Sequence, residues 1–124
     1  MKTINPKQSE KILWKPNIEE VLIDAESIKE RVKVLASEII KDYNQNNPPV
    51  FIGILKGSLY FFSDLTRAIP FDTEIELMSI SSYGSATKTS GVINITKDLE
   101  VSITDRHVLI IEDIVDTGLT LNFL

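Results

Sequence analysis

Apolar and polar positions along the chain follow two periodicities, which predict an alternation of strands and helices. Uninterrupted apolar runs at residues 50–55 and 108–111 are typical of strands buried on both faces, as in parallel sheets covered by helices. Apolar residues recur at a helical spacing from residue 28 to about residue 43, and residues 59–68 form a second predicted helix. Asp24 is well placed to cap the first of these helices.

The remaining predicted elements are strands at residues 21–23, 73–81 and 92–96, and a helix that begins at Leu119. A long polar loop at residues 82–91 separates two of these strands. The order predicts an α/β fold with a mainly parallel sheet flanked by helices. We expect an N-terminal arm at residues 1–17 and a domain at residues 18–124. The last helix has only six residues, barely more than one turn, so the sequence looks cut short and the domain partial.

The segment at residues 107–120 carries the most informative chemistry. Its apolar strand, expected in the centre of the sheet, leads directly to Glu112 and Asp113, and open α/β sheets bind ligands at this end of their strands. Adjacent acids on a strand point to opposite faces, but at a strand end both can reach the hydroxyls of a ribose or a magnesium ion. The alternative is a pair of solvated charges.

A short turn into a helix follows the acid pair, and such turns point free N–H groups at an anion. It contains hydroxyl groups, a glycine that permits close backbone approach, and an acid that needs a role other than holding phosphate: Asp116, Thr117, Gly118, Leu119 and Thr120. A phosphorylated ribose would suit this turn. The alternatives are a plain helix start with a permissive glycine, and Asp116 as its N-cap.

Two further segments are candidates for ligand contact. The second buried strand ends in Leu55, Lys56, Gly57 and Ser58, where an ammonium group and backbone N–H groups can meet a second anion. The alternative is a surface lysine at a strand-to-helix turn. The long loop opens with Ser82, Tyr83 and Gly84, which predict either a mobile lid or an ordinary exposed loop.

Composition excludes several classes of function. The chain has 124 residues and a net charge of −5, so it is a poor candidate for binding nucleic acid. It has no cysteine and a single histidine, which excludes disulfides, thiolate zinc sites and multi-histidine metal sites. It has neither an apolar signal core nor an apolar run near the ~20 residues that span a bilayer. We therefore expect no membrane association and, by default, a cytoplasmic location.

Together these motifs resemble the type I phosphoribosyltransferases, and among them the hypoxanthine–guanine phosphoribosyltransferases. The sequence VLIIEDIVDTGLT resembles that family's phosphoribosyl pyrophosphate motif, LKGS its pyrophosphate loop, and SSYG followed by TKTSG its flexible active-site loop. The three motifs occur in the order expected for the family. An aspartate at position 116 is typical of the enzymes that act on 6-oxopurines.

The resemblance implies a role for each candidate residue. Glu112 and Asp113 would hold the ribose hydroxyls, directly or through Mg²⁺, and Asp116 would be the general base near purine N7 and N9. Residues 116–120 would cradle the 5′-phosphate. Lys56 and Gly57 would meet the pyrophosphate, with a cis Leu55–Lys56 peptide. The implied reaction transfers ribose 5-phosphate from phosphoribosyl pyrophosphate to hypoxanthine or guanine, which gives IMP or GMP and pyrophosphate.

Other interpretations stay open because the family's base-reading residues lie beyond the last motif and have no counterpart in these 124 residues. The chain would then be an inactive truncated remnant, or a non-catalytic regulator that senses a phosphoribosyl ligand. A phospho-accepting receiver domain also has acids at a strand end, but it places them after its first strand. We expect a homo-oligomer, since Tyr60, Phe61 and Phe62 indicate either a subunit contact or core packing.

Overall fold

The computed structural model describes residues 19–82 and 93–124, which fall into two units, Met1–Glu30 and Arg31–Leu124. The predicted N-terminal arm at residues 1–17 lies outside the described residues. So do Tyr83 and Gly84 of the predicted lid. Among the described residues, no helix has the length and apolar character needed to cross a membrane.

In the first unit, residues 19–24 lead into helix α2 (Ala25–Asp42). The Ser27 N–H donates a hydrogen bond to Asp24 Oδ1 (2.7 Å), which confirms Asp24 as the cap. Hydrogen bonding with the Ser27 side chain, and then with its N–H, lowers the pKa of the Asp24 carboxyl. The predicted strand at residues 21–23 is wrong. Val21 has no regular structure and Leu22 and Ile23 form a bend, and these three residues are 48%, 84% and 70% exposed. An apolar triplet alone does not supply the backbone pairing that a strand needs.

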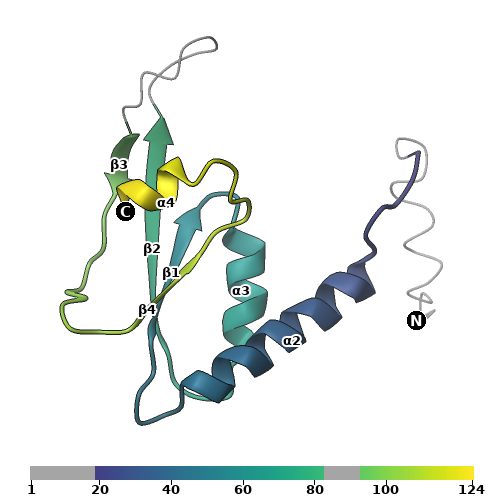
Figure 1. Ribbon diagram of the computed structural model, residues 1–124, viewed down its shortest axis with the longest axis horizontal. Helices are drawn as coiled ribbons and strands as arrows, with labels where there is room; N and C mark the ends of the chain where they lie inside the picture. Colours follow the sequence, from purple (N-terminus) through teal and green to yellow (C-terminus); the bar gives the residue numbers. More distant parts are fainter. Residues whose placement is uncertain (1–18, 83–92) are drawn as a thin grey trace, which may run out of the picture. The chain divides into compact units, whose positions relative to one another are not determined.

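The second unit is built on a four-stranded sheet in the order β3-β2-β1-β4. Its strands are β1 (Val50–Leu55), β2 (Glu74–Ser82), β3 (Ile93–Lys97) and β4 (Val108–Ile111). Strand β1 runs parallel to both β2 and β4, and only β3 is antiparallel. With α3 (Leu59–Arg67) and α4 (Leu119–Phe123), the structure confirms the predicted α/β fold with a mainly parallel sheet (Figure 1).

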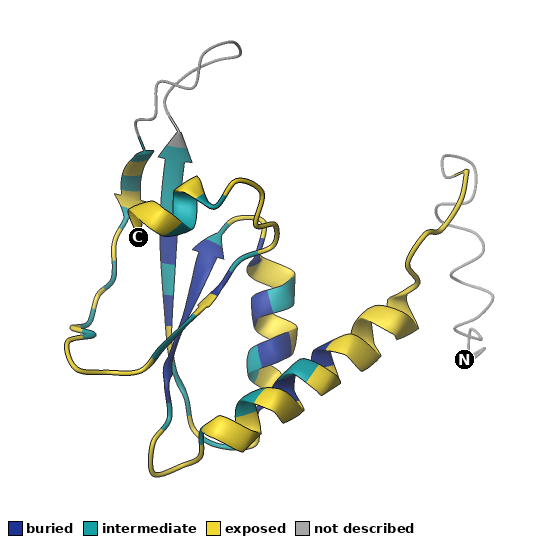
Figure 2. Ribbon diagram, viewed as in Figure 1, coloured by how far each residue is buried: buried dark blue, intermediate teal, exposed yellow. Residues whose placement is uncertain are grey.

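Strand β1 lies at the centre of the core, and nearly all of its residues are buried (Figure 2). Apolar side chains pack on both faces of the sheet. On one face Phe51 and Ile111 pack with buried residues of α2 and α3, namely Val32, Ala36, Phe62 and Leu65. On the other face Val50, Ile52, Ile54 and Met78 pack beneath Leu99 and Ile103 of the segment between β3 and β4. The unbroken apolar sequence of β1 follows from burial on both sides.

Two polar contacts fix the segment that leads into β4. The buried carboxylate of Glu76 accepts a hydrogen bond from the Glu100 N–H (2.9 Å), and Arg106 pairs with Glu74 (2.7 Å). The Val50 N–H then donates to the carbonyl oxygen of His107 (2.8 Å), which begins the pairing of β1 with β4. These contacts bring the strand that carries the acid pair alongside β1.

Strand β4 is an edge strand of the described sheet, so its predicted central position is wrong. It pairs with β1 and with no other described strand, and Ile110 is 45% exposed. The prediction that β4 is buried on both faces is also wrong, since only Ile111 is buried among its four residues. An apolar run resembles a covered strand, but it does not fix the order of the strands and so does not ensure that both faces are covered.

Candidate functional site

Two of the predicted motifs meet at one end of the sheet. Strands β1 and β4 are parallel neighbours, with Gly53 opposite Ile111, so the segments that follow them leave from the same edge (Figure 1). A Cβ atom added to Gly57 would overlap the carboxylate of Asp113 and stand 2.6 Å from its Cγ. The turn after β1 and the acid pair after β4 are therefore in direct contact.

The two acids lie just beyond the last residue of β4, where strand alternation no longer applies. The Asp113 N–H donates to Glu112 Oε1 (3.0 Å), and the Ile114 N–H donates to Asp113 Oδ1 (2.9 Å). Burial, and then the hydrogen bond with Asp113, raise the pKa of Glu112. The hydrogen bonds with Glu112 and with the Ile114 N–H lower the pKa of Asp113. Asp113 is therefore the stronger acid of the pair.

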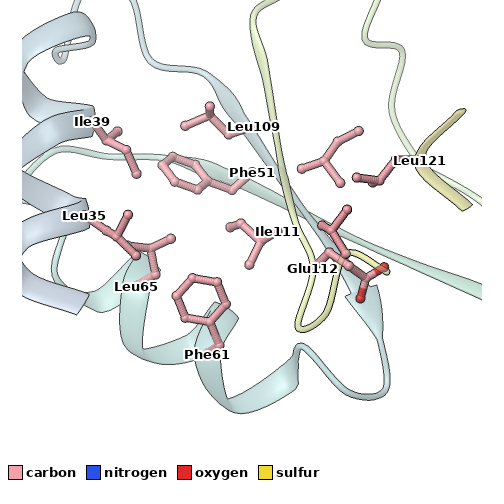
Figure 3. A pocket seen from close by; sticks show the side chains of 11 residues that line it. Leu35, Ile39, Phe51, Phe61, Leu65, Leu109, Ile111, Glu112 and Leu121 are labelled. Atoms are coloured by element: carbon pink, nitrogen blue, oxygen red, sulfur yellow. The ribbon is translucent and has the colours of Figure 1, made fainter. Parts of the chain in front are cut away.

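A largely apolar cavity of about 360 Å³ explains the desolvation of Glu112 (Figure 3). Side chains of α2, β1, α3, β4 and α4 line it, and Glu112 is the one charged residue among them: Leu35, Ile39, Phe51, Phe61, Leu65, Leu109, Ile110, Ile111, Glu112, Val115 and Leu121. Because apolar walls disfavour a charge, Glu112 is the acid of the pair that more readily keeps a proton.

The turn between the acid pair and α4 is open to solvent. Asp116 and Thr117 are exposed, and Gly118 has a φ of +78°, a left-handed conformation that favours glycine. Gly118 is the N-cap of α4, which begins at Leu119, so the alternative in which Asp116 caps this helix is wrong. Within the described residues, the Asp116 carboxylate makes neither a hydrogen bond nor an ion pair. Its side chain is thus accessible to a ligand.

In the turn between β1 and α3, the Leu55–Lys56 peptide is cis, which confirms the expectation from the resemblance. Lys56 and Gly57 are exposed. Ser58 is fully buried, and its hydroxyl donates to the carbonyl oxygen of Ile54 (2.5 Å). The Ser58 hydroxyl is therefore committed to the fold, and the ammonium group of Lys56 and the backbone remain available to an anion.

One group that contributes to this site, the backbone N–H of Ile114, was not predicted from the sequence. The Ile114 N–H orients the Asp113 carboxylate, although Ile114 itself is apolar and 74% exposed. No sequence signal marks such a role, because every residue except proline carries a backbone N–H. Of the predicted lid, the described part includes only Ser82, the last residue of β2.

The donor set suits a hard divalent cation that is shared with a substrate. Glu112 and Asp113 are adjacent carboxylates at this sheet edge, and the described residues hold no group of three or more side chains that could bind a metal ion together. Magnesium commonly binds through one or two carboxylates and completes its octahedral shell with water and substrate oxygens. Two acids are therefore compatible with Mg²⁺ and do not form a closed protein cage.

The acid pair and the two turns lie at the carboxyl ends of parallel strands, and comparison with known families identifies the class of protein to which this arrangement belongs. Residues 20–124 match the phosphoribosyl transferase domain, and the chain belongs to this family.

Similar proteins within this family include hypoxanthine and hypoxanthine-guanine phosphoribosyltransferases. A hypoxanthine-guanine phosphoribosyltransferase of Bacillus subtilis is 46% identical over 112 residues, which cover 90% of this chain and 62% of that protein. The Dictyostelium discoideum protein of the same name is 52% identical over 108 residues, covering 85% and 60% of the two chains. A crystal structure of a Staphylococcus aureus hypoxanthine phosphoribosyltransferase superposes with a TM-score of 0.78 at 44% identity, over 87% of this chain and 58% of that one. The chain thus spans about 60% of the length of such relatives.

Proposed function

We propose that this chain carries the sugar-phosphate part of the active site of a purine salvage transferase. The reaction moves ribose 5-phosphate from phosphoribosyl pyrophosphate to hypoxanthine or guanine, giving IMP or GMP and pyrophosphate. The observation that carries the proposal is the contact between Gly57 and the Asp113 carboxylate, which joins the two predicted substrate-binding turns at one sheet edge. The relatives' names support a 6-oxopurine as the acceptor.

Each turn has a separate part of the substrate to bind. The acid pair accepts hydrogen bonds from the two ribose hydroxyls, and the charge on Asp113 favours this role. The turn of Asp116, Thr117, Gly118, Leu119 and Thr120 binds the 5′-phosphate through backbone N–H and hydroxyl groups. Lys56 and the backbone of Gly57 contact the pyrophosphate.

The bond changes follow from these positions. The bond between C1′ and the pyrophosphate oxygen breaks, and a bond forms between C1′ and a ring nitrogen of the purine, whose proton is released. Asp116 accepts that proton, because its exposed carboxylate is unpaired among the described residues. The ammonium of Lys56 stabilises the charge on the departing pyrophosphate.

Glu112 and Asp113 would hold a magnesium ion, which would offset the negative charge of the pyrophosphate. The two acids can hold a magnesium ion only while at least one of them is ionised. Asp113 serves this purpose over the wider pH range, because its pKa is the one held low.

The test compares binding with turnover. We expect calorimetry to show that the chain binds phosphoribosyl pyrophosphate in the presence of Mg²⁺, and that Asp113→Ala weakens this binding. Asp116→Asn should keep the binding, since an amide preserves the shape of the turn. In an assay of IMP formation, Asp116→Asn should lower turnover by roughly 10²–10⁴-fold, the usual contribution of a general base.

The outcomes separate the candidate functions. Equal turnover of Asp116→Asn and the parent would remove the general-base role. Binding without turnover by the parent would favour a regulator that senses phosphoribosyl pyrophosphate, or a remnant that retains half of a site. Absence of binding would contradict the proposed function. Sedimentation of the same sample tests the expected homo-oligomer.

A further inference from the structure

Gly57 and Asp113 approach each other more closely than any other residue at position 57 would allow. The place of a Cβ on residue 57 is occupied by the Asp113 carboxylate, with Cγ at 2.6 Å and Oδ1 at 3.1 Å. Non-bonded carbon atoms normally stay about 3.5–4.0 Å apart. A methyl group at position 57 would therefore force one of the two partners to move.

The turn that contains Gly57 is the more firmly held partner. Next to it, Ser58 is fully buried and its hydroxyl donates to the Ile54 carbonyl oxygen (2.5 Å). The Ser58 carbonyl oxygen also accepts a hydrogen bond from the Phe62 N–H (2.7 Å), which ties it to α3. Asp113, by contrast, is exposed, and its carboxylate ends a short rotatable side chain. A methyl group at position 57 would thus displace the carboxylate and leave the turn in place.

We infer that Gly57 is a positioning residue for the Asp113 carboxylate. By lacking a side chain, it lets the carboxylate stand directly against the turn that begins with Lys56. The spacing between the group that receives the ribose hydroxyls and the backbone that meets the pyrophosphate is set by this contact. This inference rests on the proposed function, and it assigns Gly57 a task separate from its own contact with the anion.

The first test needs no ligand and uses amide NMR on the 124-residue chain. The Ile114 N–H donates to Asp113 Oδ1 (2.9 Å), so its chemical shift and hydrogen exchange report where the carboxylate lies. In Gly57→Ala we expect the Ile114 signal to move toward its position in Asp113→Ala and to exchange faster. An Ile114 signal that matches the parent's would overturn the inference.

Two controls separate positioning from general damage. Gly53→Ala also creates a close contact, 2.7 Å from Phe62 Cδ2, but it lies in the core and should leave the Ile114 signal in place. The double variant with Gly57→Ala and Asp113→Ala has lost the opposing carboxylate. If Gly57→Ala alone does not fold, recovery of the fold in the double variant supports the inference, and failure of the double variant overturns it.

The second test measures binding of phosphoribosyl pyrophosphate with Mg²⁺ by calorimetry. Residues that orient a ligand-binding group typically contribute about 10–100-fold to affinity. We expect a loss of this size in Gly57→Ala, and no additional loss when Gly57→Ala is added to Asp113→Ala. Equal affinity of Gly57→Ala and the parent would overturn the positioning role. If the parent itself does not bind, the proposed function fails, and the Ile114 signal still decides the position of the carboxylate.

Discussion

Glu112 and Asp113 both carry a carboxyl group, but their surroundings shift the two pKa values in opposite directions. Glu112 lines an apolar cavity, and this burial raises its pKa. Asp113 is exposed, and its hydrogen bonds with Glu112 and with the Ile114 N–H lower its pKa. Neighbouring carboxylates repel each other, and this repulsion adds to the rise in the pKa of Glu112.

This difference predicts a pH-dependent effect of Glu112→Gln. Because the folded-state pKa of Glu112 lies above its ordinary value of 4.5, its contribution to stability is present below about pH 4.5 and is lost as the pH rises through the raised pKa. Glutamine keeps an acceptor for the Asp113 N–H and does not titrate. We expect the urea midpoint of Glu112→Gln, relative to the parent, to rise with pH across this window and then level off.

The control is Glu26→Gln, which changes an exposed acid in the first turn of α2. It should show no comparable rise in the same window. A Glu112→Gln difference that stays constant from pH 4 to neutral pH would contradict the burial of Glu112 against the cavity.

At the scale of elements, α3 packs closely on β1. Gly53 in β1 lies directly beneath Phe62 of α3, and the two buried residues leave no room for a Cβ at position 53. This fit sets how closely α3 approaches the sheet.

Gly53→Ala tests this packing. A Cβ at position 53 would stand 2.7 Å from Phe62 Cδ2 and 3.1 Å from Leu77 Cδ2, and overpacking of this kind typically costs about 1–3 kcal/mol. We expect a loss of that size in the free energy of unfolding, measured in urea. Phe62→Leu gives up ring contacts but makes room, so the cost of Gly53→Ala should shrink in its presence. Strictly additive losses would show that the two residues do not compete for space.

At the scale of the whole molecule, the elements from α2 onward could be predicted because their apolar spacing records burial. Two features could not. Strand β4 has the sequence of a central strand yet lies at the edge of the described sheet, since local sequence does not specify strand order. The contact between Gly57 and Asp113 joins residues on different turns, and it appears only when β1 and β4 pair. The residue types of the site were predictable from motifs, but their mutual distances were not.

Because the site exists only when the sheet is assembled, its ligand should stabilise the fold as a whole. A ligand that binds the folded state alone raises the free energy of unfolding by RT ln(1 + [L]/Kd), or about 2.7 kcal/mol at 100 times Kd. We therefore expect phosphoribosyl pyrophosphate with Mg²⁺ to raise the urea midpoint of the chain, and chelation of the metal to reverse much of that rise. Asp113→Ala, which removes an exposed carboxylate and leaves the core intact, should reduce the ligand-dependent part while unfolding normally without ligand. If the ligand stabilises Asp113→Ala as much as the parent, it binds elsewhere on the molecule, and the sheet edge formed by β1 and β4 is not its site.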